Sequence, residues 1–135
     1  MFDSYKPTLY LIRGLSGAGK STFSLALVRA YGAVHAEADM YFMQNGKYNF
    51  QPALLSKAHS WCQDIAYSAL SAGRTVVVSN TSTTEKEVKV YQDIAKECQA
   101  NFVSLIVENR IGTMSVHDVP EEVLQRQRNR FSVKL

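Results

Sequence analysis

The sequence predicts an α/β fold built on a short, mainly parallel sheet of about four strands that is flanked by helices. Short runs of apolar β-formers alternate along the chain with longer segments whose apolar residues recur at helical spacing. The connections between these segments are short, as is typical of strand–helix–strand units. A glycine-rich stretch, GLSGAGKS at residues 14–21, lies directly between the first strand and the first helix. These observations together favour strands and helices that alternate around one sheet.

Four segments have the composition of buried strands. The first is an apolar run bounded by Pro7 and Gly14, two residue types that interrupt regular structure. The third contains three consecutive valines without polar alternation, as expected for a strand that is covered on both faces. After the second strand, an Asn-Gly pair predicts a tight turn. The predicted strands are Thr8–Arg13, 33–39, 74–80 and 102–107.

Four helices are predicted between and after these strands. The first ends at Gly32, because glycine commonly caps a helix C-terminus. Ser82 precedes Glu85 by three residues, which is the spacing of a capping box at a helix start. Asp118 precedes Glu121 with the same spacing and so predicts the start of the last helix. The predicted helices cover residues 20–32, 52–73, 82–101 and the segment from 118 onward.

Composition and charge are those of a folded globular domain. The 135 residues are 46% hydrophobic and 20% charged, which excludes the disordered class of low hydrophobicity. The formal net charge of +3 is too small to predict nucleic-acid binding by itself. Cys62 and Cys98 lie far apart in predicted helices and indicate free thiols in a reducing compartment. Since the chain has no apolar run of about 18 residues, we expect one cytoplasmic domain over residues 1–135 with no membrane contact.

The glycine-rich stretch satisfies the pattern G-x-x-x-x-G-K-[ST] of a phosphate-binding P-loop. Its glycines let successive backbone N–H groups turn toward an anion, and the N-terminus of the next helix adds partial positive charge. We expect Lys20 to bridge the β- and γ-phosphates of ATP and Ser21 to ligate Mg²⁺. The sequence therefore predicts a P-loop NTPase fold with ATP and Mg²⁺ as cofactors. The predicted nucleotide-binding residues are Gly14, Ser16, Gly17, Ala18, Gly19, Lys20, Ser21 and Thr22.

Among P-loop proteins, the remaining sequence favours a kinase. It contains no N-K-x-D guanine motif, and no apolar strand ends in the pair of acids typical of a motor ATPase. Ligands of parallel sheets bind beyond the carboxyl ends of the strands. Asp39, after the second strand, is expected there to orient or deprotonate an acceptor hydroxyl, and Arg110, after the fourth, to stabilise charge on the γ-phosphate. The candidate catalytic residues are therefore Lys20, Asp39 and Arg110.

Six stretches along the chain resemble, in the same order, the P-loop kinases related to polynucleotide kinase, which include small AAA-like ATP-binding proteins of phages and bacteria. The stretches are LIRGLSGAGKST, ADMYF, NGKYNF, AHSWC, VVVSNTST and VHDVPEEVLQRQRNRF. The resemblance implies a single P-loop kinase domain over nearly the whole chain. It also implies a 5′-hydroxyl kinase scheme in which Asp39 matches the acceptor-side aspartate, Lys20 and Ser21 match the ATP and Mg²⁺ residues, and Arg110 resembles the lid arginine.

The chain departs from that family pattern at two places. Relatives usually carry an acid at the end of the third strand, within D-T-N or D-N-T-N, whereas this chain has Ser79 and Asn80 there. Polynucleotide kinase also tends to carry an arginine three residues after its aspartate, and Phe42 holds that position here. The first departure puts coordination of a metal-bound water in doubt, and the second indicates an altered acceptor.

The acceptor is therefore open on the sequence alone. Tyr41, Phe42, Tyr48 and Phe50 crowd around the Asn-Gly turn, where stacking on a base is one use for them. A nucleotide or oligonucleotide 5′ end is the expected acceptor, and a (deoxy)nucleoside monophosphate is the alternative within the same class. A kinase for a small sugar or an antibiotic is a third possibility. The missing acid also leaves open an ATP-binding regulatory protein with little turnover, and an exposed sheet edge leaves open a homo-oligomer.

Overall fold

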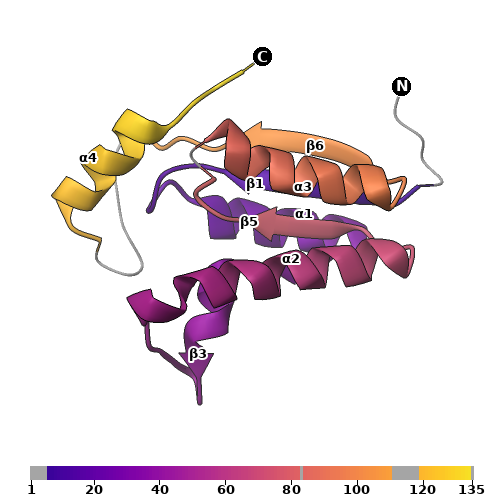
Figure 1. Cartoon of the computed structure of the whole chain (residues 1–135), viewed down its shortest axis with the longest axis horizontal. Helices are drawn as coiled ribbons and strands as arrows, with labels where there is room; N and C mark the ends of the chain where they lie inside the picture. The colour runs from indigo at the N-terminus through magenta and orange to yellow at the C-terminus, as the bar shows by residue number, and fades with distance from the viewer. Residues whose placement is uncertain (1–5, 83, 111–118, 135) are drawn as a thin grey trace.

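The computed structural model describes residues 6–82, 84–110 and 119–134, and its helices and strands alternate along the chain (Figure 1). In chain order the elements are β1 (Thr8–Arg13), α1 (Lys20–Tyr31), β2 (Val34–Ala36), η1 (Ala38–Phe42), β3 (Met43–Gln44), β4 (Lys47–Tyr48), η2 (Pro52–Leu54), α2 (Leu55–Ser71), β5 (Val76–Ser79), α3 (Glu85–Glu97), β6 (Asn101–Ile106) and α4 (Glu121–Arg130), where η denotes a 3₁₀-helix. The predicted strands and helices are present in the predicted order.

One parallel sheet joins four of the strands in the order β2-β5-β1-β6. Val78 of the inner strand β5 is level with Leu11 of β1 on one side and with Ala36 of β2 on the other. On the far side of β1, Ile12 is level with Leu105 of β6. Because the strands all run in the same direction, their carboxyl ends share one edge of the sheet. The predicted parallel α/β architecture is therefore confirmed.

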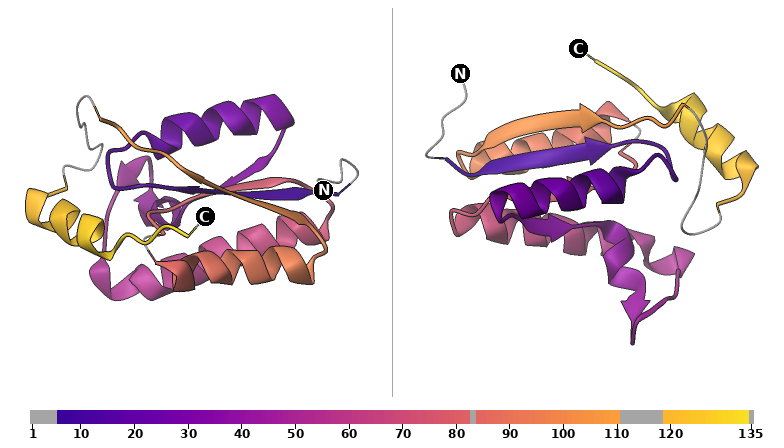
Figure 2. Two further views of the ribbon diagram at one scale, coloured as in Figure 1. Left: turned by 90° about the horizontal axis from the view of Figure 1, so that it is seen from above. Right: turned by 180° about the vertical axis from the view of Figure 1, so that it is seen from behind.

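Helices cover both faces of this sheet, with α1 on one face and α2 and α3 on the other (Figure 2). The valines of β5 explain why that strand lacks polar alternation. Val76 and Val78 pack with residues of α2 and α3, whereas Val77 packs on the α1 side, and all three are fully buried. Burying one valine side chain is worth roughly 1.5–3 kcal/mol. Both faces of the inner strand therefore contribute to stability.

The second strand is shorter than the sequence predicts. It was expected to continue to about Asp39, but β2 ends at Ala36 and the chain turns into η1. The backbone N–H of Ala38 donates a hydrogen bond to Asn80 Oδ1 at 2.9 Å, and this contact directs the chain out of the sheet. Asp39 consequently lies in a 3₁₀-helix beyond the strand end.

The capping box predicted at Ser82 and Glu85 is wrong by two residues. Thr84 is the N-cap of α3, and its side-chain oxygen accepts a hydrogen bond from the Glu87 N–H at 3.3 Å. Ser82 has a positive φ of 46°, and its carbonyl oxygen accepts a hydrogen bond from Arg13 Nε at 2.8 Å. This contact with β1 keeps Ser82 outside the helix.

The Asn-Gly turn predicted after the second strand is confirmed as a hairpin between β3 and β4. Asn45 and Gly46 have φ values of +52° and +76°. Positive φ at both central residues is the requirement of a two-residue type I′ turn, which Asn-Gly satisfies at low cost. The hairpin projects from the end of η1, away from the main sheet (Figure 1).

The last helix, α4, lies beyond the carboxyl ends of the strands, separate from the layers that cover the sheet (Figures 1 and 2). Its predicted start at Asp118 falls outside the described residues, and α4 begins at Glu121 with Pro120 as its N-cap. Across residues 6–82, 84–110 and 119–134, the helices are too short or too polar to cross a membrane.

Candidate functional site

The loop between β1 and α1 is shaped by its glycines. A Cβ on Gly14 would lie 2.5 Å from the carbonyl oxygen of Val107, so only glycine allows the loop to pass this close to the end of β6. Gly17 and Gly19 have φ values of +81° and +95°, which glycine adopts readily. Gly19 is also the N-cap of α1, whose first turn carries no acidic side chain. The glycine conformations and the absence of acidic side chains in the first turn of α1 are compatible with the anion site that the motif predicts.

Lys20 is held over this loop. Its Nζ donates a hydrogen bond to the carbonyl oxygen of Leu15 at 2.9 Å. Burial lowers the pKa of the Lys20 ammonium, and the charges of Glu37 and Asp39 oppose that shift without cancelling it. The lysine is therefore electrostatically coupled to two carboxylates that follow β2, which is where the sequence predicted only Asp39.

Glu37 is a candidate site residue that the sequence analysis missed. Its Oε1 accepts a hydrogen bond from Ser21 Oγ at 2.8 Å and lies 3.2 Å from His35 Nε2. Burial would raise the pKa of the Glu37 carboxyl, but contacts with His35, Ser21 and Ser79 outweigh burial and lower it. The carboxylate is therefore held in its charged form against the hydroxyl that was predicted to ligate Mg²⁺. The available signal was the position of Glu37 directly after a strand.

Asp39 lies on the exposed side of η1, two residues further along the chain. Tyr48 of the hairpin donates a hydrogen bond from its hydroxyl to Asp39 Oδ1 at 3.2 Å. Burial and the neighbouring Asp39 raise the pKa of Tyr48 to about 12, so the phenol stays protonated and continues to donate at neutral pH. One oxygen of the predicted acceptor-side carboxylate is thereby oriented by the hairpin.

The end of β5 has a structural part in the site. Asn80 Oδ1 holds the start of η1 through the N–H of Ala38, as described above, and Asn80 Nδ2 contacts Tyr91 Oη at 3.4 Å and Cys62 Sγ at 3.6 Å. The preceding residue, Ser79, is buried, and its hydroxyl makes no well-formed hydrogen bond with other described residues. Asn80 thus connects η1 with α2 and α3.

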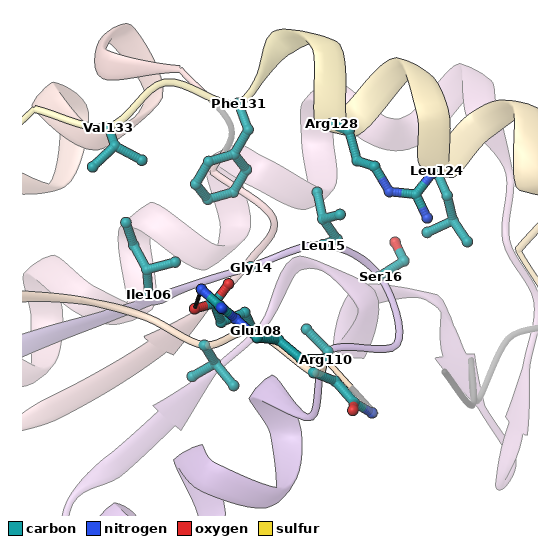
Figure 3. A pocket seen from close by; sticks show the side chains of 13 residues that line it. Gly14, Leu15, Ser16, Ile106, Glu108, Arg110, Leu124, Arg128, Phe131 and Val133 are labelled. Carbon is teal, nitrogen blue, oxygen red and sulfur yellow. Dashed lines mark hydrogen bonds and ion pairs between the residues drawn. The ribbon is translucent and has the colours of Figure 1, made fainter. Parts of the chain in front are cut away.

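Beside the P-loop is a cavity of about 370 Å³, a size in the range of small-molecule sites (Figure 3). Its walls come from the loop, from the end of β6, and from α4 with the residues after it. The apolar side chains of Leu15, Leu124 and Phe131 line it, as do the loop residues Gly14 and Ala18. An apolar chamber that opens next to a phosphate-binding loop has the character expected for the nucleoside part of a nucleotide.

Arg110 also lines this cavity, at its exposed rim. Its guanidinium pairs with Glu108 Oε1 at 2.9 Å, and 82% of the side chain is exposed (Figure 3). A surface pair of this kind contributes little to stability. The structure thus places Arg110 near the cavity, engaged with Glu108, while Lys20 is engaged with Leu15 deep in the loop.

Gln127 of α4 makes two hydrogen bonds with Ser16 of the P-loop. Its Oε1 accepts from the Ser16 backbone N–H, and its Nε2 donates to Ser16 Oγ, both at 3.0 Å. These residues are 111 positions apart, and the sequence carried no signal that would pair them. Arg13 holds the chain after α4 in a similar way, because its Nη2 donates to the Ser132 carbonyl oxygen at 2.7 Å and its guanidinium lies 4.8 Å from the Phe131 ring centre.

The predicted nucleotide-binding and catalytic residues fall into two groups. Gly14, Ser16 and Ala18 line the cavity, and Thr22 lies exposed in the first turn of α1. Lys20 and Ser21 instead face the β2 side, where Lys20 is coupled to Asp39 and Ser21 contacts Glu37. The loop is therefore shared between an apolar cavity on one side and two carboxylates on the other.

The aromatic residues around the hairpin have a more structural role than the sequence suggests. Phe42 is only 2% exposed and packs edge-on against Tyr41, Tyr48 and Phe50. Tyr41 also contacts the ring of Trp61 on α2. Phe50 remains 45% exposed and stacks on Tyr48 at an interplanar angle of 9°. The cluster is thus a small core that supports the hairpin, with one exposed ring.

Oxygen ligands near the P-loop suit Mg²⁺, which prefers hydroxyl, carboxylate, phosphate and water oxygens. Ser21 supplies a hydroxyl, and Glu37 supplies a charged carboxylate at 2.8 Å from it. In the described part of the chain, no three His, Cys, Asp or Glu residues gather into a metal site of their own. The residues therefore fit a metal that is carried mainly by phosphates and water, with few protein ligands.

Comparison with known families matches residues 9–133 to a model described as an AAA domain. Among curated proteins, NEDD4-binding protein 2 of Homo sapiens is 33% identical over 91 residues. That match covers 66% of this chain and 5% of the human protein, so the chain spans only a small part of that relative's length.

Several solved structures share the fold. An APS kinase CysC mutant from Mycobacterium tuberculosis is 15% identical with a TM-score of 0.61, over 93% of this chain and 96% of that one. A gluconokinase from Sinorhizobium meliloti is 16% identical with a TM-score of 0.63, over 97% and 78% of the two chains. A chain of the Pnkp1/Rnl/Hen1 complex is 20% identical with a TM-score of 0.65, over 92% and 40%.

At these identities, the structural likeness establishes a shared fold, and the match over residues 9–133 establishes the family. The parallel sheet, the glycine loop and the placement of Lys20 and Ser21 agree with both findings. The chain therefore belongs to the AAA domain family and has the kinase-like α/β P-loop fold.

Proposed function

We propose that this chain is an ATP-dependent phosphotransferase of the P-loop kinase type, acting on a nucleotide or nucleic-acid 5′ end, with residues 1–135 working as a single kinase domain. The observation that carries the proposal is that the P-loop meets carboxylates beyond β2: Ser21 Oγ donates to Glu37 Oε1 at 2.8 Å, and Asp39 lies exposed two residues further along the chain. A P-loop alone serves many activities. A P-loop with an exposed carboxylate beyond the next strand supports transfer of the terminal phosphate to a second substrate.

Each predicted residue has one task in this proposal. Glycine backbone N–H groups and Lys20 bind the phosphates of ATP, and the cavity beside the loop takes the nucleoside. Ser21 holds Mg²⁺, which when bound neutralises charge on the phosphates. Arg110 stabilises the γ-phosphate from the rim of the cavity, after exchanging its contact with Glu108 for the nucleotide. Asp39 faces the acceptor.

The proposed reaction is a direct transfer. The acceptor hydroxyl oxygen forms a bond to the γ-phosphorus as the bond to the β–γ bridging oxygen breaks, and ADP leaves with that bond's electron pair. The hydroxyl proton passes to the Asp39 carboxylate. Tyr48 orients Asp39 through the 3.2 Å hydrogen bond from its hydroxyl to Asp39 Oδ1. Catalysis here is mostly positioning and electrostatics, as is usual for phosphoryl transfer.

The hairpin supports an acceptor with an aromatic ring system. Phe50 is exposed and stacked on Tyr48, which also contacts Asp39, so a base that stacks on Phe50 would lie near the proposed proton acceptor. Base–aromatic stacking contributes about 1–3 kcal/mol per base and tolerates different bases. One structural relative belongs to an RNA repair complex. A (deoxy)nucleoside monophosphate would use the same ring and remains the alternative acceptor.

Small non-aromatic acceptors form a second candidate class, because one structural relative is a gluconokinase. A different candidate, an ATP-binding regulator with little turnover, is favoured by Ser79 and Asn80 at the end of β5, since Asn80 is occupied in holding η1. These candidates differ in product, and one assay separates them.

The decisive experiment is transfer of labelled γ-phosphate from Mg-ATP to a panel of acceptors. The panel holds 5′-hydroxyl DNA and RNA oligomers, nucleoside monophosphates and gluconate, and Asp39→Asn and Lys20→Ala serve as inactive controls. A labelled oligomer supports the 5′-end kinase, and a labelled nucleoside diphosphate supports the monophosphate kinase. Labelled gluconate would move the proposal to small metabolites. ATP binding without any labelled acceptor would contradict the kinase proposal in favour of the regulator.

A further inference from the structure

The carboxylate that reaches the P-loop hydroxyl comes from the residue directly after β2. Glu37 follows Ala36, the last residue of β2, and Ala36 is level with Val78 of β5. The next residues, Glu37 directly after β2 and Ser79 at the end of β5, are therefore neighbours across the two strands. The same edge of the sheet thus has a carboxylate after β2 and a hydroxyl at the end of β5.

Two polar contacts fix the Glu37 side chain. Ser21 Oγ donates to Oε1 at 2.8 Å, His35 Nε2 lies 3.2 Å from the same oxygen, and only 16% of the side chain is exposed. The buried hydroxyl of Ser79 adds to the group of polar atoms around the carboxylate and has no well-formed hydrogen bond in the described part of the chain. The carboxylate is mostly buried, and its contacts with His35 and Ser21 lower the cost of keeping its charge there.

We propose that Glu37 supplies the carboxylate of the Mg-ATP site, holding the metal's water shell against the Ser21 hydroxyl. This inference rests on the proposed function, because it requires ATP in the P-loop. The observed contact is consistent with metal binding by Ser21. Because the Ser21 hydroxyl donates a hydrogen bond to Glu37, the lone pairs of its oxygen can still ligate a cation. Mg²⁺ retains several waters when it binds, and a nearby carboxylate can accept hydrogen bonds from them.

The competing explanation is that Glu37 only fixes the shape of the loop through Ser21. The two explanations make different predictions for Glu37→Gln. The amide oxygen of glutamine can still accept the Ser21 hydrogen bond, but the charge is lost. If the charge serves the metal, the loss will appear only when Mg²⁺ is present. If the residue serves loop shape, ATP binding will respond equally with and without Mg²⁺.

The test is calorimetric titration of ATP into the full chain, without any acceptor, in excess EDTA and over a series of Mg²⁺ concentrations. We expect Mg²⁺ to strengthen ATP binding to the wild type. In Glu37→Gln, this Mg²⁺-dependent gain should fall by about 10–100-fold, the usual cost of losing a residue that supports a metal site from behind its ligands. ATP affinity in EDTA should stay the same or rise, because a negative charge near the phosphates has been removed.

A second variant makes the inference specific. Glu37→Gln combined with Ser79→Asp returns a carboxylate to this edge of the sheet from the neighbouring strand, and we expect it to recover most of the Mg²⁺-dependent gain. Bound Mn²⁺ provides an independent readout, because its paramagnetic resonance signal in the ATP complex should change in Glu37→Gln and return in the double variant. Asp64→Asn, an exposed change on α2, is the matched control for loss of a carboxylate charge and should leave the metal dependence within about twofold.

The outcomes separate the inference from the proposed function. A full Mg²⁺-dependent gain in Glu37→Gln would overturn the inference alone. An equal loss with and without Mg²⁺ that the double variant does not recover would also overturn it, because Glu37 would then act on loop shape. A wild type that binds no ATP under either condition would overturn both the inference and the proposed function.

Discussion

The two sides of the P-loop are built in different ways. On the proposed nucleotide side, which faces the cavity, glycines determine the path of the chain. Gly14 lies too close to the carbonyl oxygen of Val107 to carry a Cβ, and Gly17 and Gly19 have positive φ. On the proposed acceptor side, beyond β2, side-chain hydrogen bonds determine the arrangement. Asn80 accepts one from the start of η1, and Tyr48 donates one to Asp39. The comparison teaches that the conformation of the P-loop is determined almost entirely by its own glycines. The arrangement on the proposed acceptor side depends instead on several side chains from other parts of the chain.

The variant expected to separate the roles of the two sides most clearly is Asp39→Asn. We expect transfer to an acceptor to fall by about 10²–10⁴-fold, the range for loss of a general base, because the amide cannot accept the acceptor's proton. ATP affinity should change little. Single-turnover transfer and ATP titration on the same preparation measure both. Asp64→Asn, an exposed change on α2, is the control, and a strong loss of ATP affinity in Asp39→Asn would contradict the division between the sides.

On the nucleotide side, Lys20→Ala should lower transfer by about 10²–10³-fold, since it removes a fixed positive charge from the phosphates. Unlike Asp39→Asn, it should also weaken ATP binding. The fold should survive, because the Lys20 side chain donates its hydrogen bond to the carbonyl oxygen of Leu15 in the loop rather than to the core. Thermal unfolding and ATP titration check both expectations, with Lys89→Ala on the surface of α3 as control. Unchanged transfer would rule out the proposed kinase activity.

A stability test asks whether the hairpin depends on its own small core. Phe42→Ala should lower the free energy of unfolding by about 3–5 kcal/mol, since it empties a site that is only 2% exposed. Phe50→Ala removes a half-exposed ring from the same cluster and should cost much less. Denaturant unfolding measures both variants. Equal costs would mean that the cluster is loosely packed and that Phe50 is as much core as Phe42.

The smallest expected effect belongs to Tyr48→Phe, which removes the hydrogen bond to Asp39 Oδ1 and leaves the ring in place. A hydrogen bond to a charged group is worth about 1.5–3 kcal/mol at most, and this contact is exposed, so we expect a loss in kcat of only about 2- to 10-fold. KM for ATP should stay unchanged. Steady-state kinetics with both substrates test this, with Tyr67→Phe on the exposed side of α2 as control. An unaltered kcat would remove Tyr48 from the positioning of Asp39.

Local sequence patterns correctly predicted the elements whose conformation is determined by residues close together in the sequence. The run from Thr8 to Arg13 matched β1 residue for residue, and the glycine loop led into α1 at Lys20 as expected. The Asn-Gly turn and the buried valines of β5 were also correct. In each case the hydrogen bonds or apolar contacts that determine the element are specified by residues a few positions apart, so a short window carries the information.

Local patterns failed where a distant contact determined the conformation. Ser82 was expected to cap α3, but Arg13 binds its carbonyl oxygen across 69 positions. The second strand was expected to run to Asp39, but Asn80 binds the N–H of Ala38 across 42 positions. A propensity or spacing rule does not register such contacts, because each residue alone fits the expected element.

What the sequence by itself determined is the parallel α/β layout, the P-loop and the identity of Lys20 and Ser21 as its polar side chains. What only the tertiary structure decided is which groups meet that loop: Glu37 at Ser21 from β2, and Gln127 at Ser16 from α4. The physical reason is that a phosphate loop is formed by consecutive backbone groups and specified by its own glycines. The side chains that surround it come from segments 16 and 111 positions away, and they reach it only after the sheet and helices have packed.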